Sequence, residues 1–407
     1  MYRRVLVALD GAEWSNLAME ASLEIAALDK MSRVIGCHVY GALMHRTRFY
    51  QMEPGLPEKY QEEKELTRLR GAHEDLITDG MKIISDAYLA PLNHLANQKQ
   101  IVFEGVTPEG RNYMEILKAA TQKQADLIVV GAHGHGYVPE AILGSTSERI
   151  LSHSWHSDVL LMKKPWNLRK APILVGVDGS QNSYAALLRA ANLASSVGTR
   201  VKAVAVFDPY LHSGVFTNIA GVLPEEKQAK FNFTAQEKLH DEIIDDGLEQ
   251  LYRSNLEQGV QLVSNLDVKI DSEVLSGKVF PQIHHHAAAL NASLVVLGRW
   301  GLHKEAPSLI GSNTLNFSRI CTTNLLVVAA PNKEIILPNL ETEEPLEWTE
   351  EALKILDRIP QFARTMARTA IEKRARESSA DVVEESLVRA ISKKMGMQKK
   401  PSGNDEP

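Results

Sequence analysis

Two glycine-rich segments have residue types and a spacing that suit anion binding. The first, GAHGHGYVPEAILGSTSE, covers residues 131–148 and follows the apolar run ADLIVV. The second, GRWGLHKEAPSLIGSNT, covers residues 298–314 and follows SLVVL. Both have the pattern G-x2-G-x9-G-S. Glycine lets a backbone approach a phosphate closely, and a helix that begins after the last glycine would offer it free N–H groups. We therefore predict one anion site in each segment.

Hydroxyl and carboxyl groups accompany both segments. The hydroxyl residues after the last glycine are Ser145, Ser147, Ser312 and Thr314. Asp10 ends the apolar run VLVALD, and Asp178 ends the matching run ILVGVD. A carboxylate at the end of a first strand suits a ribose hydroxyl or a metal ion better than a phosphate. Together these residues predict a nucleotide site with an anion cradle, an acidic residue and an apolar slot for a base.

A structural alternative is that the glycines only form tight strand-to-helix turns, with the serines as N-caps. Two copies with the same spacing, each paired with an aspartate, favour phosphate binding over this alternative. His133 and His135 are candidates for phosphate contact rather than for catalysis, because no partnered acid or nucleophile is evident in the sequence. The chain has no G-x4-G-K-[ST] loop, which argues against a P-loop nucleoside triphosphatase.

The chain is an internal repeat. Gly131 and Gly298 are 167 residues apart, and Asp10 and Asp178 are 168 apart. Each unit alternates continuous apolar runs with helical segments, which predicts an α/β fold with a doubly wound parallel sheet covered on both faces. We place the units at residues 1–166 and 170–331. Such sheets bind ligands at the carboxyl ends of their strands.

These features resemble the universal stress protein family, in its ATP-binding branch, twice over within residues 1–331. The resemblance implies five-stranded sheets, association of two units within the chain, and a homodimer as a further expectation. It also implies ATP or another adenine nucleotide, bound with Mg²⁺. The residues that match the family's nucleotide contacts are Asp10, Val39, Gly131, His133, Gly134, Gly144, Ser145, Ser147, Asp178, Val206, Gly298, Gly301, Gly311, Ser312 and Thr314.

Two further points concern the residues that carry the resemblance. Asp10 and Asp178 are also the candidates for contact with Mg²⁺ that arrives with the nucleotide. The second copy departs from the family pattern, because Trp300 stands where histidine or arginine is usual and Arg299 lies one place earlier.

The C-terminal part has a different character. We predict an acidic linker at 332–346, a helical module at 347–396 that includes a helix over 380–396, and a disordered tail at 397–407. The module resembles the small C-terminal domain of the B subunit of light-independent protochlorophyllide reductase, on residues Trp348, Ala352, Ile359, Pro360, Arg364, Glu372 and Ala375. This implies a docking module for a protein partner, with redox or tetrapyrrole partners as the class to which the resemblance points.

Composition narrows the function classes. The 407 residues are 44% apolar and 24% charged, with a net charge of -6, so nothing indicates nucleic acid binding or membrane insertion. Cys37 and Cys321 lie in or beside apolar runs, as expected for reduced thiols of a cytoplasmic protein. We expect a stress-response regulator or adaptor that binds nucleotide without rapid turnover. A slow ATPase or nucleotidyl-transferring enzyme and a nucleotide-free scaffold are the alternatives.

Overall fold

The structure is a computed structural model of the whole chain. It describes residues 1–135, 142–208, 245–302, 310–329, 331, 334–337, 346–356 and 382–394, together with residues 368, 371–372, 374–375, 378 and 380. The chain divides into two compact units, one comprising Met1–Pro209 and Glu249–Leu337, the other comprising Tyr210–Leu248 and Pro338–Pro407.

The first repeat contains five strands and the helices that connect them. In chain order its elements are β1 (Arg4–Ala8), α1 (Glu13–Ala26), β2 (Arg33–Cys37), α2 (Ala42–Met52), η1 (Glu53–Gly55), η2 (Glu58–Tyr60), α3 (Glu63–Gln98), β3 (Val102–Val106), α4 (Asn112–Gln122), β4 (Leu127–Gly131), α5 (Ser145–His153) and β5 (Asp158–Met162).

The second repeat follows a short 3-10 turn, η3 (Leu168–Lys170), and its described elements alternate strand and helix as in the first repeat. They are β6 (Ile173–Gly176), α6 (Gln181–Val197), β7 (Val201–Phe207), α10 (Asp245–Leu262), β8 (Ile270–Ser276), α11 (Val279–Ala289), β9 (Leu294–Gly298), α12 (Ser312–Ile320) and β10 (Asn324–Val328).

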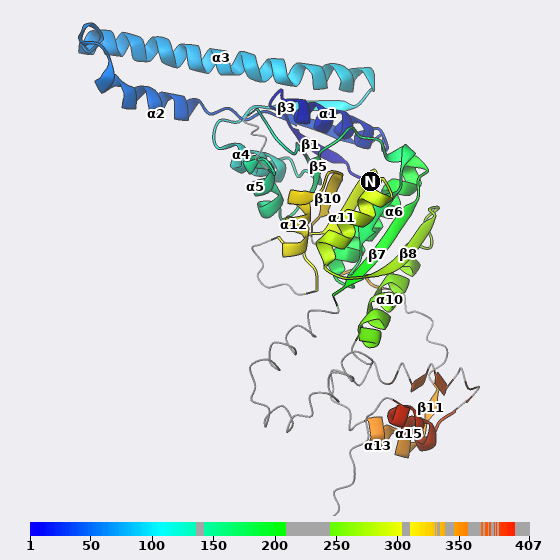
Figure 1. The fold of residues 1–407 in the computed structure, drawn as a ribbon. Coiled ribbons are helices and arrows are strands. Elements are labelled where there is room, and N and C mark those ends of the chain that lie inside the picture. The colour runs from blue at the N-terminus through cyan, green and yellow to red at the C-terminus, as the bar shows by residue number, and fades with distance from the viewer. Residues whose placement is uncertain are drawn as a thin grey trace, which may run out of the picture. The chain divides into compact units, whose positions relative to one another are not determined.

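The strands of both repeats form one ten-stranded sheet in the order β3-β2-β1-β4-β5-β10-β9-β6-β7-β8 (Figure 1). Within each repeat all neighbouring strands are parallel, whereas β5 and β10 pair antiparallel at the centre. Both central strands are buried along their whole length. The predicted α/β fold and the predicted pairing of the two units within the chain are therefore confirmed.

Helices cover both faces of the sheet, because successive strand residues point to opposite sides. Val5 and Val7 of β1 belong to an apolar cluster that also contains buried residues of α1, α3, α6 and α10. Leu6 belongs to a second cluster, which contains buried residues of α4, α5, α11 and α12. This two-sided covering is the doubly wound arrangement that the near-continuous apolar runs predicted.

Between β2 and β3 the chain forms α2 and the 36-residue α3, which lie alongside each other (Figure 1). Only the C-terminal part of α3 is anchored in the core, where Leu92 and Ala96 are fully buried. At the other end, the Arg70 side chain bonds to Glu53 at 2.7 Å, and this ion pair joins α3 to η1. Pro91 lies inside α3 without ending it.

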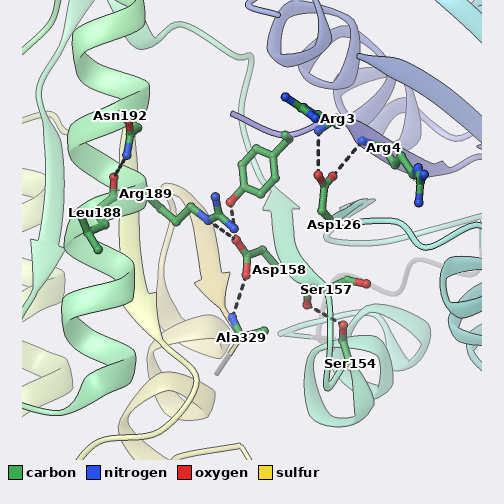
Figure 2. Close-up of polar contacts among 11 residues, drawn as sticks. Arg3, Arg4, Asp126, Ser154, Ser157, Asp158, Leu188, Arg189, Asn192 and Ala329 are labelled. Carbon is green, nitrogen blue, oxygen red and sulfur yellow. Dashed lines mark hydrogen bonds and ion pairs between the residues drawn. The ribbon is translucent and has the colours of Figure 1, made fainter. Parts of the chain in front are cut away.

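The junction between the repeats contains a buried carboxylate. Asp158, the first residue of β5, accepts a hydrogen bond from the Tyr2 hydroxyl (2.6 Å) and from Arg189 Nε (3.0 Å) (Figure 2). Its other oxygen accepts the Ala329 N–H at 2.9 Å, from the residue that follows β10. The matching residue of the second repeat is Asn324, whose Oδ1 accepts the N–H of Lys163 at 2.9 Å.

The C-terminal part of the second unit, called the C-terminal unit from here on, differs from the predicted helical module. Its described elements are β11 (Glu347–Trp348), α13 (Glu350–Leu356), β12 (Val382–Val383) and α15 (Glu385–Lys394). The helix predicted over 380–396 is wrong at its start, because the two β-branched valines of β12 pair in parallel with β11. Val383 is nevertheless buried, in a small core with Ala352, Leu356, Ile371, Ala375 and Val388. Pro360 and the predicted tail at 397–407 lie outside the described residues.

Part of the predicted acidic linker, residues 334–337, belongs to the first unit. Ile335 and Leu337 pack against the core of the first unit, and the Ile335 N–H donates to Gln181 Oε1 at 2.6 Å. In the part of the chain that the structure describes, no helix is both long and apolar enough to cross a membrane.

Candidate functional site

The predicted site residues meet at the carboxyl edge of each half-sheet. β1 lies between β2 and β4, and the helices that follow β1 and β4 pack on opposite faces, so the strand order reverses between β1 and β4. Asp10 follows β1, and Gly131 ends β4. A crevice at such a reversal is the usual ligand position in this class of fold. Asp178 and Gly298 hold the same places in the second repeat.

Each aspartate ties the end of its first strand to the glycine loop. Asp10 Oδ1 accepts the Ala12 N–H at 3.0 Å, and Oδ2 accepts the His135 N–H at 3.3 Å. In the second repeat, Asp178 accepts the N–H groups of Ser180 and Leu302, both at 3.0 Å. The two repeats thus share one arrangement, in which a carboxylate lies directly beside the loop.

The second glycine of each loop is required by this carboxylate. A Cβ added at Gly134 would lie 2.4 Å from Asp10 Oδ2, and one at Gly301 would lie 2.4 Å from Asp178 Oδ2. The glycine is therefore explained by contacts within the chain, whether or not a ligand binds.

The first and third glycines are also required by internal contacts. A Cβ at Gly131 would lie 2.7 Å from the backbone of Trp14, and one at Gly298 would lie 2.8 Å from that of Asn182. At Gly144, a Cβ would lie 2.8 Å from the carbonyl oxygen of Ala132. Contacts within the chain thus explain why these positions are glycine, as the alternative of purely structural turns requires.

The serines do not act as the N-caps which that alternative assigned to them. Gly144 is the N-cap of α5 and Gly311 that of α12, and both helices begin at the following serine, as predicted. Ser145 and Ser312 are exposed there. Because glycine has no side chain, no N-cap side chain takes up the N–H groups of these first turns. Both helices therefore present first-turn donors at the crevice.

The other two hydroxyls make internal hydrogen bonds. Ser147 Oγ donates to the carbonyl of Gly131 at 2.6 Å, and Thr314 Oγ1 donates to that of Gly298 at 2.9 Å. Each bond joins the first turn of the helix to the end of the preceding strand. These hydroxyls fix the start of each helix to the end of its strand, and their protons are already in use.

The two strand-two valines occupy equivalent positions. Val34 lies opposite Val5, and Val201 lies opposite Ile173, which is the equivalent of Val5 in the second repeat. Val39 comes five residues after Val34, and Val206 comes five residues after Val201. Val206 is still inside β7, whereas Val39 lies beyond the end of β2, so the rim of the first site is less regular than that of the second.

The inserted helices, α3 between β2 and β3 and α10 between β7 and β8, contribute residues that the sequence analysis missed. The ring of Tyr88, from α3, packs on Gly11, where an added Cβ would lie only 2.3 Å from it. Its hydroxyl is 3.4 Å from His135 Nε2, and its ring centre is 5.0 Å from that of His38. Asn255 of α10 takes the equivalent place at Gly179. Tyr88 and Asn255 are 167 residues apart, which equals the spacing of the repeat, so the sequence could have paired them. Their residue types differ, and the match therefore did not stand out.

Burial keeps two histidines of the first site neutral near pH 7. The pKa of His38 is lowered by its burial, against the opposing charge of Asp10. Burial also lowers the pKa of His133, and the nearby Lys163 charge lowers it further. Neutral imidazoles can accept as well as donate hydrogen bonds.

Two surface hollows lie away from these residues. One, of about 400 Å³, is lined by Arg169, Lys170, Arg200 and Lys269 among others, and a second of about 390 Å³ lies between α4 and the end of α5. Among the described residues, no group of three or more His, Cys, Asp or Glu side chains is arranged to hold a metal ion.

Comparison with known proteins places both repeats in one family. The model described as "Universal stress protein family" matches residues 1–163 and again 171–329. The universal stress protein YxiE of Bacillus subtilis is 27% identical over 150 residues, which are 37% of this chain and 92% of YxiE. One from Methanocaldococcus jannaschii is 26% identical over 167 residues, covering 40% of this chain and 84% of its own.

The solved structures support the same fold. A universal stress protein from Archaeoglobus fulgidus superposes with a TM-score of 0.51 at 17% identity, over 81% of this chain and 97% of that one. The model described as "Proto-chlorophyllide reductase 57 kD subunit" matches residues 348–391, which confirms the second predicted resemblance.

Proposed function

Because the chain belongs to the universal stress protein family, we propose that each of its two repeats binds an adenine nucleotide, with ATP the first candidate, at the carboxyl edge of its sheet. One observation carries the proposal. In both repeats the glycine loop that leads into a helix with a glycine N-cap bonds to an aspartate at the point where the strand order reverses. The helix N-terminus suits phosphates, and the carboxylate suits a ribose hydroxyl or Mg²⁺ that accompanies the phosphates.

The proposed nucleotide acts as a regulatory ligand. Asp10 already accepts two N–H groups, one of them from the glycine loop. A ribose hydroxyl or a magnesium ion at this carboxylate competes with the loop N–H, so binding alters how the loop is held. A stress-response regulator or adaptor needs such a change, and the C-terminal unit is the proposed docking module for its protein partner.

A nucleotide-free scaffold is the second candidate function. The observation in its favour is that the glycines, Ser147 and Thr314 are all accounted for by contacts within the chain. Slow ATP hydrolysis or nucleotidyl transfer differs from both candidates by its products, and steady-state release of phosphate or pyrophosphate by the purified protein would reveal it.

Calorimetric titration of nucleotide-free protein with ATP, with and without Mg²⁺, tests the proposal. We expect up to two sites, the first tighter, and mass analysis of undenatured protein should find co-purified adenine nucleotide. Asp10→Asn should weaken one site by about tenfold. Asp29→Asn is the matched control, because Asp29 also accepts a backbone N–H (Met31, 2.9 Å) but lies after α1, away from the crevice. Folded protein that binds no nucleotide at millimolar ATP would exclude the proposal in favour of the scaffold.

A further inference from the structure

Arg299 lies in the glycine loop of the second repeat, but its side chain reaches into the first. The residue is only 1% exposed. Its Nη1 donates to the carbonyls of Leu151 (2.7 Å) and Ser154 (2.5 Å), and its Nη2 donates to that of Ser152. These carbonyls belong to the last turn and C-cap of α5, where a helix has unsatisfied acceptors and the negative end of its dipole. Arg299 therefore caps the C-terminus of α5.

Two tryptophans complete the environment of this guanidinium. Its central carbon lies 4.9 Å from the ring centre of Trp155 and 5.1 Å from that of Trp300. Burial lowers the pKa of Arg299 to about 10, so the group remains a cation at neutral pH. Ring faces and helix carbonyls surround the charge in place of a carboxylate. Trp300, which departs from the family pattern, thus forms part of the contact between the repeats.

The backbone of Arg299 belongs to the second site. Its carbonyl accepts the Gly311 N–H at 2.8 Å, directly before α12 begins. The same residue therefore contacts the start of the second site's helix through its backbone and the end of α5 through its side chain. The start of α5, nine residues and about 13 Å away, faces the first site.

A cation of the first repeat makes the reciprocal contact. Lys163 follows β5, and its Nζ donates to the carbonyls of Ser318 and Cys321 at the end of α12, both at 2.7 Å. The charge of Lys163 also lies near His133 in the first glycine loop, whose pKa it lowers. The two contacts are not copies of each other, since the first repeat has Ala132 where the second has Arg299.

We propose that Arg299 is a positioning residue of the first site and Lys163 one of the second, so that the two sites are energetically coupled. This rests on the proposed nucleotide binding. A helix of nine residues is not stable by itself, and a cation at its C-terminus stabilises it. The first-turn N–H groups of α5 are therefore held in place partly by a loop that belongs to the other site. A ligand that shifts loop 298–301 alters the affinity of the first site, and the reverse holds by linkage.

Hydrogen exchange of the full-length protein, resolved by peptide and titrated with ATP, tests the coupling. In ligand-free protein, Arg299→Met should speed exchange at residues 148–153 more than at the equivalent turns of α12. With ATP, the concentration that half-protects residues 145–148 should rise about tenfold, whereas that for 312–315 should change less than about threefold, because Gly311 bonds to the Arg299 backbone. Arg299→Lys keeps the charge and should give an intermediate shift.

Two comparisons make the result decisive. Arg319→Met is the matched control, because Arg319 also joins the repeats, through Glu148 of α5 at 2.5 Å, but not at the helix C-terminus. It should leave exchange at residues 150–153, in the last turn of α5, unchanged, because its partner Glu148 lies in the first turn. Lys163→Met should weaken the second site more than the first. Unchanged exchange of residues 148–153 in both Arg299 variants, or equal weakening by Arg319→Met, would overturn the coupling. If ATP protects neither loop of the parent protein, the proposed function fails, and the ligand-free comparison still decides whether Arg299 positions α5.

Discussion

Arg189→Met should destabilise the junction between the repeats, because Asp158 would lose its cationic partner. The Asp158 side chain is only 5% exposed, and Arg189 Nε donates to it at 3.0 Å (Figure 2). Methionine keeps most of the arginine stem and removes the charge. The perturbation therefore acts on the electrostatics of one buried carboxylate and leaves the packing of α6 nearly intact.

The size of the effect follows from burial and from the remaining donors. Breaking a fully buried ion pair costs about 3–5 kcal/mol. Arg189 is 40% exposed, so water screens its charge, and the Tyr2 hydroxyl still donates to the carboxylate. We expect a loss of about 2 kcal/mol. For a unit of roughly 300 residues, with an unfolding entropy of about 0.6 kcal/mol per kelvin, this lowers Tm by about 3 °C.

The loss should depend on pH in a defined direction. Burial raises the pKa of Asp158 in the folded protein, and Arg189 opposes that rise. A carboxyl group with a raised folded pKa contributes most stability below its unfolded pKa, and this contribution is lost as pH rises through the folded value. Removing Arg189 raises the folded pKa further. The difference in Tm between parent and variant should therefore be large at pH 7 and shrink towards pH 5.

Differential scanning calorimetry at both pH values measures this, with Arg3→Met as the matched control. Arg3 contacts Asp126 through its backbone N–H at 2.7 Å, so the loss of its side chain should leave Tm nearly unchanged. Asp158→Asn should rescue Arg189→Met, because the equivalent position is already an asparagine, Asn324. An unchanged Tm at pH 7, or a double variant as unstable as Arg189→Met alone, would show that this ion pair does not stabilise the junction.

Five further variants have expected outcomes. Ser145→Ala should weaken ATP binding at the first site by about 1 kcal/mol in calorimetric titration, and it should leave Tm unchanged because Ser145 is exposed. Gly144→Ala should lower Tm even without ligand, because its Cβ would lie 2.8 Å from the Ala132 carbonyl oxygen. Ending the chain after Leu337 should leave a folded, nucleotide-competent core by circular dichroism and titration but abolish capture of the partner, whereas ending it after Pro331 should cost stability, because Ile335 and Leu337 pack on the core. Trp348→Phe should destabilise the C-terminal unit by about 1 kcal/mol, because Trp348 Nε1 donates to Glu372 at 2.9 Å. Hydrogen exchange of peptides from this unit, measured at increasing urea concentrations, gives the change. Equal stability of parent and variant would mean that this bond contributes nothing.

The repeat, the parallel sheets and the position of the loops could be predicted from the sequence, because each depends on local patterns. An apolar run followed by a helical period predicts a strand and a helix wherever the chain lies in space. The spacing between Gly131 and Gly144 placed the start of α5 correctly at Ser145 for the same reason. Asp10 could be assigned to the crevice because parallel strands bring their carboxyl ends to one edge.

The local pattern was misleading where pairing partners decide the structure. Val382 and Val383 precede a helical period and were predicted to continue it. In the structure they form a strand, because the distant residues Glu347 and Trp348 offer backbone groups to pair with. A two-residue strand has too little sequence signal of its own to compete with the period that follows it.

The remaining features were decided only by tertiary contacts between residues far apart in the chain. Tyr88 and Asn255 enter the crevices because the inserted helices lean on Gly11 and Gly179, and no spacing rule predicts where a long helix lies. The sequence by itself established that Trp300 departs from the family pattern and that Arg299 lies one place earlier. Only the antiparallel pairing of β5 with β10 brings the loop of one repeat to the helix end of the other, where a buried cation can satisfy the free carbonyls of α5.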